Sequence, residues 1–193
     1  YYFVQAIDSE NRSTFGHLRN YTPGKGLNIT YGFATRAVGE NGETLAGFRT
    51  FTETQKAGIR SVLAHIEEHV NVKFTEGANP TLNYYLHQME SEDTLGYARY
   101  GGGVYLSSTR YGSNDAFRTD IPYHLSGRKL VEYDGWSTAL HETGHSLGLN
   151  HPFGNTDANL STAEDRDTLT AMSYTPGETV PRVEVGGGDY YPN

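Results

Sequence analysis

The stretch HETGHSLGLNHP, residues 141 to 152, is the most informative segment of this sequence about fold and function. It places three histidines, one glutamate and two glycines in twelve positions, a composition that an ordinary amphipathic helix does not need. His141 and His145 are four residues apart, so on a helix both imidazoles leave the same face, about 6 Å apart along the axis. The pair can therefore share one metal ion.

The residues around this pair complete a metal site. Glu142 lies about 100° round the helix from His141, beside the ion and free to hold a water molecule, which is the placement of a general base. Gly148 can adopt the left-handed conformation that ends a helix and turns the chain so that His151 approaches the same ion. Three neutral imidazoles at about 2.0 to 2.1 Å leave a fourth position for water, which is typical of a catalytic zinc site.

Two motifs carry a family resemblance. HExxHxxGxxH resembles the signature of the metzincin zinc endopeptidases, and Pro152 after the third histidine resembles their serralysin branch. Residues 163 to 174, AEDRDTLTAMSY, resemble the serralysin segment that leads into the Met-turn. The resemblance implies that Met172 forms a hydrophobic floor under the zinc site. It implies that Tyr174 can coordinate zinc and swing away to bind the oxyanion of the substrate.

The resemblance also implies a fold and a biological role. The expected fold is an α+β, zincin-like domain: a twisted mixed sheet with an antiparallel edge strand, a backing helix, an active-site helix and an irregular C-terminal part with the Met-turn. The expected role is a secreted, extracellular and bacterial zinc endopeptidase, monomeric, which acts on proteins or peptides. A propeptide or an inhibitor protein is the further partner expected.

A substrate-binding strand is expected at residues 96 to 99, GYAR, just before a glycine-rich turn. This segment resembles the edge strand that borders the metzincin cleft, and an exposed sheet edge binds an extended peptide through main-chain hydrogen bonds. Tyr97 and Ala98 are therefore expected to offer backbone groups to the substrate. An ordinary interior strand is the alternative interpretation of the same segment.

Other functions stay open at this point. A catalytically silent zinc-binding recognition module would keep the three histidines, although metal binding alone does not require Glu142. A metal-free protein with incidental histidines is a second alternative. An astacin-like metzincin is a third, and Pro152 argues against it.

Composition limits the classes of partner. The formal charge of −8 and the pI near 5.4 argue against nucleic acid and anionic membranes, which need clustered lysine and arginine. The chain has no cysteine, so a metal must be held by histidine or carboxylate ligands. No stretch approaches the roughly 20 apolar residues of a membrane span. The first residues, YYFVQAIDSE, lack an initiator methionine and a signal-peptide pattern, so a processed or trimmed product is expected.

One catalytic domain over residues 1 to 193 is expected, with an upper part to about residue 148 and a lower part from about 149. Residues 1 to 25 are read as an irregular arm. Thr52 and Gln55 form a capping-box pattern, and apolar residues continue from it at helical spacing. The predicted strands are residues 27–33, 72–75, 82–86, 96–100 and 103–108, and the predicted helices are residues 53–69 and 137–148. This order suits a sheet with helices packed against it.

A second histidine pattern lies in the first predicted helix. HIEEH, residues 65 to 69, satisfies the reversed zincin pattern H-x-x-E-H. Measured from Ile66 at the apolar centre, His69 falls about 60° and His65 about 100° to one side. His65 is expected to be solvated and His69 to lie at the margin of the apolar face, and neither is expected to bind a metal. His17, His87 and His124 stand alone and are assigned no role.

Calcium is left as an open expectation. The acidic residues of the lower part could hold Ca²⁺ through carboxylate oxygens, although a solvated loop is the favoured interpretation; they are Asp157, Glu164, Asp165 and Asp167. The calcium-binding nonapeptide repeats of serralysins are absent from this sequence, and so is the helix that usually follows the Met-turn. A further C-terminal part, missing or cleaved, is therefore expected.

Overall fold

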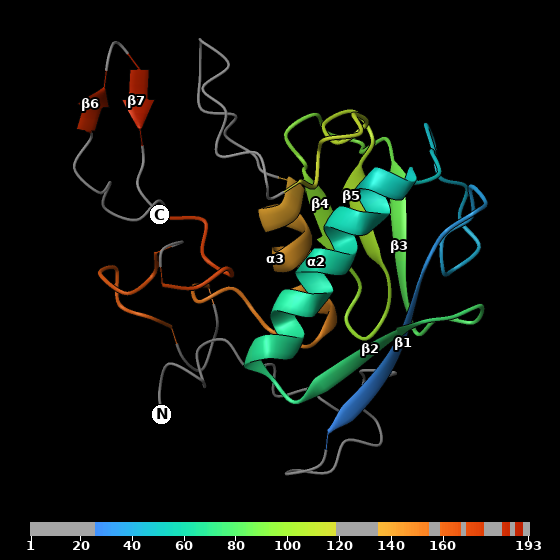
Figure 1. The fold of residues 1–193 in the computed structure, drawn as a ribbon, viewed down its shortest axis with the longest axis horizontal. Helices are drawn as coiled ribbons and strands as arrows, with labels where there is room; N and C mark the ends of the chain where they lie inside the picture. Colours follow the sequence, from blue (N-terminus) through green and yellow to red (C-terminus); the bar gives the residue numbers. More distant parts are fainter. Residues whose placement is uncertain are drawn as a thin grey trace.

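The computed structural model describes residues 26–118, 135–154, 159–166, 169–175, 183–185 and 188–190. The irregular arm expected at residues 1–25 lies outside them. In chain order the elements are β1 (Leu27–Phe33), α2 (Glu53–His69), β2 (Val72–Glu76), β3 (Leu82–His87), β4 (Gly96–Ala98), β5 (Val104–Ser107), α3 (Gly135–Ser146), β6 (Val183–Val185) and β7 (Gly188–Tyr190), as Figure 1 shows.

The main sheet has five strands in the order β2-β1-β3-β5-β4. The first four run parallel, and β4 pairs antiparallel with β5 at one edge. The predicted mixed sheet with an antiparallel edge strand is thus confirmed. Strands β6 and β7 form a separate antiparallel pair.

Helix α2 begins at the predicted capping box. The Gln55 backbone N–H donates to Thr52 Oγ1 at 3.3 Å, and the Thr52 N–H donates back to Gln55 Oε1 at 2.9 Å. Its apolar side is buried in the main core: Ile59, Val62, Leu63 and Ile66. The predicted limits of this helix, 53 and 69, are those of the structure.

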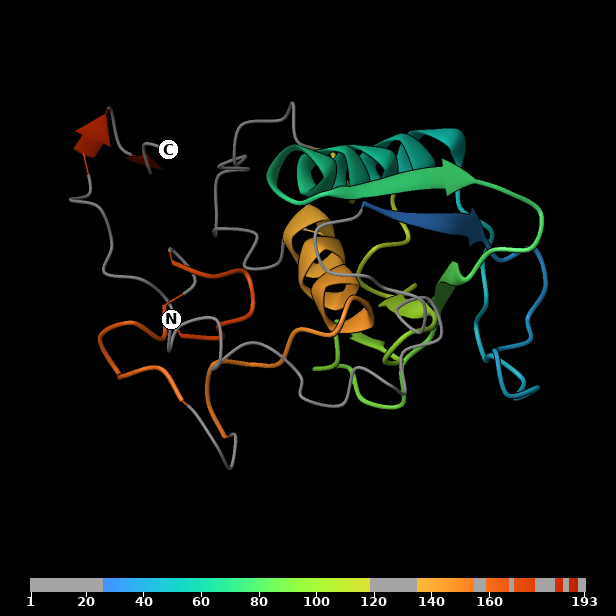
Figure 2. The same cartoon turned by 90° about the horizontal axis from the view of Figure 1, so that it is seen from below.

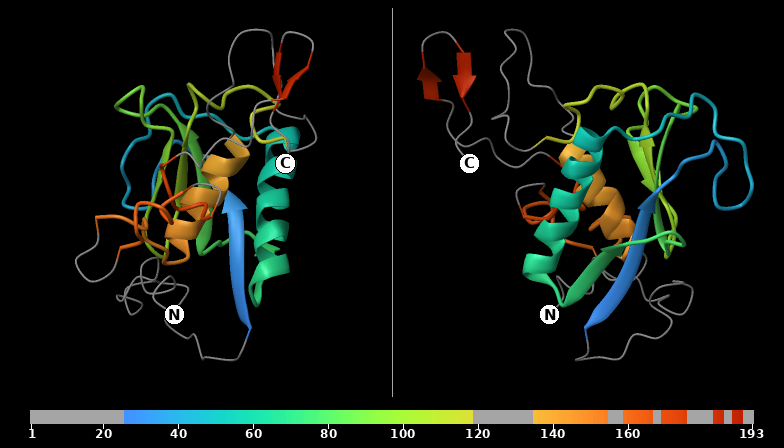
Figure 3. Two further views of the ribbon diagram at one scale, coloured as in Figure 1. Left: turned by 90° about the vertical axis from the view of Figure 1, so that its left-hand side faces the viewer. Right: turned by 45° about the vertical axis from the view of Figure 1, so that its right-hand side comes forward.

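Both helices pack on the same face of the sheet. The main core unites residues of α2 with alternate residues of the central strands, such as Tyr84, Leu86 and Leu106, and with Ala139 of α3. Figures 1 and 3 show the two helices side by side over the strands, and Figure 2 shows the same layers from below. No helix among the described residues combines the length and apolar character that crossing a membrane requires.

The opposite face of the sheet carries a second, smaller core. The rings of Tyr85, Tyr105 and Tyr97 stack in that order, with centroids 4.4 and 4.5 Å apart and planes 7° and 8° from parallel. Because side chains alternate along a strand, Tyr84 and Tyr85 fall on opposite faces. The edge strand β4 is therefore held to the sheet by its ladder with β5 and by this aromatic stack.

Candidate metal centre

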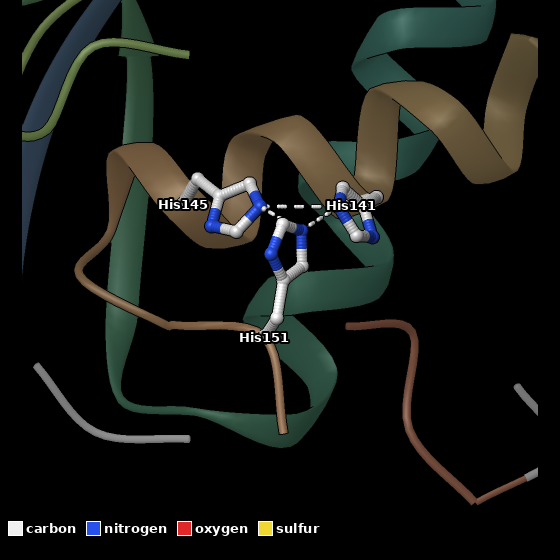
Figure 4. A group of neighbouring side chains, drawn as sticks. All are labelled: His141, His145 and His151. Carbon is white, nitrogen blue, oxygen red and sulfur yellow. Dashed lines mark hydrogen bonds between the residues drawn. The ribbon is translucent and has the colours of Figure 1, made fainter. Parts of the chain in front are cut away.

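Three histidines converge at the C-terminal half of α3. Figure 4 shows the rings of His141 and His145 on the helix and that of His151 on the segment that follows, all turned toward one point. Their Nε2 atoms lie 3.1 Å (His141 to His145), 3.2 Å (His141 to His151) and 3.0 Å (His145 to His151) apart. The spacing proposed from the sequence is thus realised in space.

Two backbone carbonyls determine which ring nitrogens face this point. His141 Nδ1 lies 2.6 Å from Ala171 O, and His145 Nδ1 lies 2.8 Å from Leu149 O. A carbonyl can only accept, so each Nδ1 carries the proton and each Nε2 offers a lone pair. Burial, with the neighbouring histidines, lowers the pKa of His141 and of His151 to about 4, which keeps both rings neutral.

Such an arrangement fits a zinc ion. Lone pairs that face one another at about 3 Å repel unless a cation lies between them. Zinc bound tetrahedrally at about 2.0 to 2.1 Å separates its ligand atoms by about 3.3 to 3.4 Å, close to the separations found here. The donor set of three neutral imidazoles, with no thiolate, is one that zinc accepts with a fourth position left open.

Gly148 makes this convergence possible. Its φ is 98°, the left-handed region predicted for it. The Leu149 N–H donates to Gly144 O at 2.9 Å and the Gly148 N–H donates to His145 O at 3.0 Å, which is the hydrogen-bond pattern of a Schellman cap. The helix ends at Ser146, two residues before the predicted limit, because this cap already includes Leu147 and Gly148. It also begins two residues before the predicted start, at Gly135.

The half of α3 that carries His141 and His145 also contacts the sheet through a buried hydrogen bond. Thr143, with no exposed surface, contacts the sheet: its Oγ1 lies 2.8 Å from the Tyr84 hydroxyl. That hydroxyl comes from β3, so a buried hydrogen bond joins the metal-bearing helix to the central strand beside it. Burial raises the pKa of Tyr84, so its hydroxyl stays protonated.

Glu142 is buried next to the edge strand. A Cβ placed on Gly96 would lie 3.1 Å from Glu142 Cγ, so the helix and the first residue of β4 are in close contact here. Burial raises the pKa of the Glu142 carboxyl to about 8, and the positive charge of a bound ion would act in the opposite direction.

The segment 169–175 contributes two residues to this region, of which Met172 packs against α3 at Gly144 and Tyr174 lies against the histidine rings. Met172 is 2% exposed, and its Sδ would lie 2.7 Å from a Cβ placed on Gly144. Tyr174 is 63% exposed, and its ring centroid lies 5.2 Å from that of His141 and 4.4 Å from that of His151. Partial burial and the charge of Glu142 raise the pKa of Tyr174, which keeps its hydroxyl a donor.

Asp165 has a position that the sequence did not reveal. Ser173 Oγ donates to its Oδ1 at 2.5 Å and Thr175 Oγ1 donates to its Oδ2 at 3.3 Å, so one carboxylate holds the residues on both sides of Tyr174. The expected solvated acidic loop is therefore wrong for Asp165. Asp157 and Asp167 of that cluster lie outside the described residues, and the potential metal groups found within the described part contain neither Glu164 nor Asp165.

The register of β4 determines which backbone groups face outward. The Arg99 N–H donates to Gly103 O and the Ser107 N–H donates to Leu95 O, both at 2.9 Å. Hydrogen-bonded pairs alternate along an antiparallel ladder, so Tyr97 turns its backbone groups toward Tyr105. The residues that direct their N–H and C=O away from β5 are Gly96 and Ala98.

Among curated proteins, the chain is similar in sequence to several serralysins. The chain is 30% identical to Serralysin A of Dickeya chrysanthemi over 156 residues, which is 78% of this chain and 32% of that protein. It is 30% identical to Serralysin B of the same organism over 186 residues, 86% of this chain and 35% of that protein. Metallopeptidase AprA of Pseudomonas marginalis is 28% identical over 133 residues, 65% of this chain and 27% of that protein. The chain thus spans about a third of the length of the curated relatives that it matches.

Two solved structures are also similar to this chain. Myroilysin is similar with a TM-score of 0.39 and 15% identity, over 78% of this chain and 70% of that one. The hatching enzyme HCE-1 of Oryzias latipes, a zinc-protease by its description, is similar with a TM-score of 0.40 and 12% identity, over 83% of this chain and 65% of that one. No protein-family model matches the chain.

Proposed function

Because this chain is a serralysin-like metzincin, we propose that it hydrolyses peptide bonds in extended protein substrates, with zinc held by His141, His145 and His151. The observation that carries the proposal is the convergence of the three Nε2 atoms within 3.2 Å of one another beside the buried Glu142. A purely structural zinc site would close its fourth position with another protein ligand. Among the described residues, this group of possible ligands consists of the three histidines and contains no fourth histidine, cysteine or carboxylate.

Glu142 is proposed as the general base. Zinc in this site supplies Lewis acidity, which polarises the substrate carbonyl and lowers the pKa of water toward about 7. The Glu142 carboxylate takes a proton from the attacking water as the water adds to the carbonyl carbon. The same carboxyl then gives that proton to the departing amine, so the group ends as it began and no covalent link to the protein forms.

Tyr174 is proposed to stabilise the oxyanion. Its exposed ring lies against His141 and His151, so the hydroxyl can reach substrate without displacing a buried group. A protonated phenol donates a hydrogen bond to the oxygen that gains charge, a contribution of about 3 to 4 kcal/mol per donor in other enzymes. Met172 contributes as the buried apolar floor of α3, and Asp165 holds the turn that presents Tyr174.

The free edge of β4 is proposed to bind the substrate backbone. Gly96 and Ala98 direct their backbone groups away from β5, and Gly96 lies beside Glu142. A peptide that added to this edge as a further strand would pass the general base without being selected for its side chains. The proposal keeps Ala98 from the sequence expectation and replaces Tyr97 by Gly96, because Tyr97 uses its backbone within the sheet and its ring in the aromatic stack.

The remaining expectations belong to the same proposal. Residues 1 to 193 form one catalytic domain, with the division near residue 148, and the protein works as a secreted, extracellular monomer under the control of a propeptide or an inhibitor protein. The serralysin relatives support the extracellular location in this proposal.

The decisive experiment compares the parent chain with Glu142→Gln, a substitution of nearly the same shape. Both are loaded with zinc, their zinc content is measured, and each is given a quenched fluorescent casein. We expect about one tightly held zinc in both proteins and cleavage by the parent alone, abolished by a chelator and restored by zinc. His145→Gln, which removes a ligand, is the control that should lose both zinc and activity.

Two results would contradict the proposal. A parent chain that holds zinc but cleaves none of several unfolded proteins would indicate a silent zinc-binding module. Full activity in zinc-loaded Glu142→Gln would remove the general-base role while leaving the metal site intact.

A further inference from the structure

We propose that the C-terminal turn of α2 forms a second, surface site for a divalent transition metal, with His65, Glu68 and His69 as its ligands. Their potential ligand atoms all lie within 4.8 Å of one another. This group is separate from the catalytic histidines, since α2 contributes none of those ligands. The proposal revises the expectation that the histidines of the HIEEH segment bind no metal.

The two histidines are held as a pair. They are four residues apart on one helix, and their ring centroids are 4.5 Å apart. His69 Nδ1 lies 2.8 Å from His65 O, and because a carbonyl only accepts, Nδ1 carries the proton. The Nε2 of His69 therefore offers its lone pair, by the same kind of backbone contact that orients His141 and His145 in the catalytic group.

Glu68, the glutamate of the H-x-x-E-H pattern, supplies the third donor. Its neighbour Glu67 is already engaged: the Phe74 N–H donates to Glu67 Oε1 at 2.6 Å, and Lys73 Nζ donates to Glu67 Oε2 at 2.5 Å. The two adjacent carboxylates thus face different surroundings, and only Glu68 joins the histidines. Two imidazoles and a carboxylate suit Zn²⁺, Ni²⁺ or Cu²⁺, and rotation about exposed side-chain bonds can close the remaining separation to about 2.0 to 2.2 Å from an ion.

Trp136 fixes one side of this site. Its ring lies edge-on to that of His65, with centroids 5.3 Å apart, and its Nε1–H donates to Ser61 Oγ at 2.9 Å. His65 is therefore positioned by a residue at the start of α3, the helix that carries the catalytic histidines. Trp136 is also the single tryptophan of the chain, so it reports on metal bound at His65.

The first test measures metal stoichiometry in the full chain. The parent protein and single variants are dialysed against increasing Zn²⁺, and the bound zinc is measured per chain. We expect two bound ions in the parent, the second more weakly held. His69→Gln and His65→Gln should weaken the second ion at least tenfold, and Glu68→Gln should weaken it several-fold. Glu67→Gln is the matched control and should leave its affinity unchanged.

The second test measures where the weak ion binds. Protein with zinc in the catalytic site is titrated with Cu²⁺, a quencher of tryptophan emission, and its retained zinc is measured throughout. We expect Trp136 emission to fall in the parent while one zinc per chain is kept. In His69→Gln the midpoint should move to at least tenfold higher Cu²⁺, with native helical circular dichroism showing that the variant is folded.

Three outcomes would overturn the second site: a parent whose single bound zinc is unaffected by His69→Gln, a second zinc that His69→Gln retains with unchanged affinity, or quenching that this variant does not shift. None of them depends on casein cleavage. A failed proteolysis assay and a failed second site can therefore be distinguished.

Discussion

Gly144 and Met172 are in direct contact across the metal-bearing helix. Gly144 is the residue before the second histidine of the helix, and a Cβ built there would lie 2.7 Å from Met172 Sδ, a separation that real side chains do not adopt. The methionine sulfur therefore occupies the space that a side chain at Gly144 would fill. The absence of a side chain at one position lets the C-terminal segment pack directly under α3.

Gly144→Ala should destabilise the protein and loosen the metal centre. The added methyl group must displace Met172 or shift the helix, and overpacking of this kind costs about 1 to 3 kcal/mol. Urea unfolding measures the loss of stability, and competition with a chromogenic chelator measures zinc affinity, which should fall with it.

The double variant Gly144→Ala/Met172→Ala tests whether the contact is the cause. If the two side chains compete for one space, the double variant should lose less stability than the sum of the two single losses. Strict additivity would show that the alanine acts through some other contact.

Gly148→Ala should damage the zinc site more than its effect on stability suggests. A residue with a Cβ is strained at the φ of 98° by about 1 to 2 kcal/mol, and relief of the strain would move His151 away from the other two ligands. Gly42→Ala is the matched control, because Gly42 has a φ of 81° and open space around it. We expect similar losses of unfolding free energy in both variants, but at least tenfold weaker zinc binding in Gly148→Ala alone. Equal zinc affinity in the two variants would show that the conformation of Gly148 in the helix cap does not position His151 for zinc binding.

Tyr84→Phe should weaken the attachment of α3 to the sheet. The variant removes the hydroxyl that lies 2.8 Å from Thr143 Oγ1 but keeps the buried ring. Thr143 still donates to Ala139 O at 2.6 Å, so it is not left without a partner. The expected loss is about 1 kcal/mol of unfolding free energy, with zinc stoichiometry unchanged. A loss of several kcal/mol would show that the hydroxyl supports more than this one contact.

Glu67 should make the stability of α2 depend on acid pH. The hydrogen bonds from Lys73 and from the Phe74 N–H hold the pKa of Glu67 below its usual value. The folded state therefore binds a proton less readily than the unfolded state. The resulting stability is complete above the unfolded pKa of about 4.3 and is lost as the pH falls through the lower folded pKa. Because the carboxylate is close to solvent, a contribution of about 1 kcal/mol or less is expected.

The measurement for Glu67 is urea unfolding of the parent and of Glu67→Gln between pH 2.5 and 7, at one zinc concentration. The difference in unfolding free energy should be constant above about pH 5 and shrink toward acid. A difference that stays the same at pH 3 and pH 7 would contradict the ionic origin of the effect.

Much of the fold was predictable because its signals are local. The capping box at Thr52 and the apolar spacing after it identify α2, and alternating apolar residues identify β1. The left-handed turn at Gly148 follows from the one residue that adopts it without strain. Helix α3 was displaced by two residues at each end, since its Schellman cap begins before the glycine and its start lies beside a segment with weak pattern.

What the sequence by itself determined is the spacing of the donors: three histidines and one glutamate, placed by helix geometry and one glycine turn within twelve residues. Contacts distant in the chain required the tertiary structure. Only the folded chain shows that Ala171 O orients His141, that Asp165 holds the turn of Tyr174, and that Trp136 stands against His65. Periodicity along a chain records which face a residue occupies. It does not record which backbone carbonyl, sheet edge or neighbouring helix will meet that face.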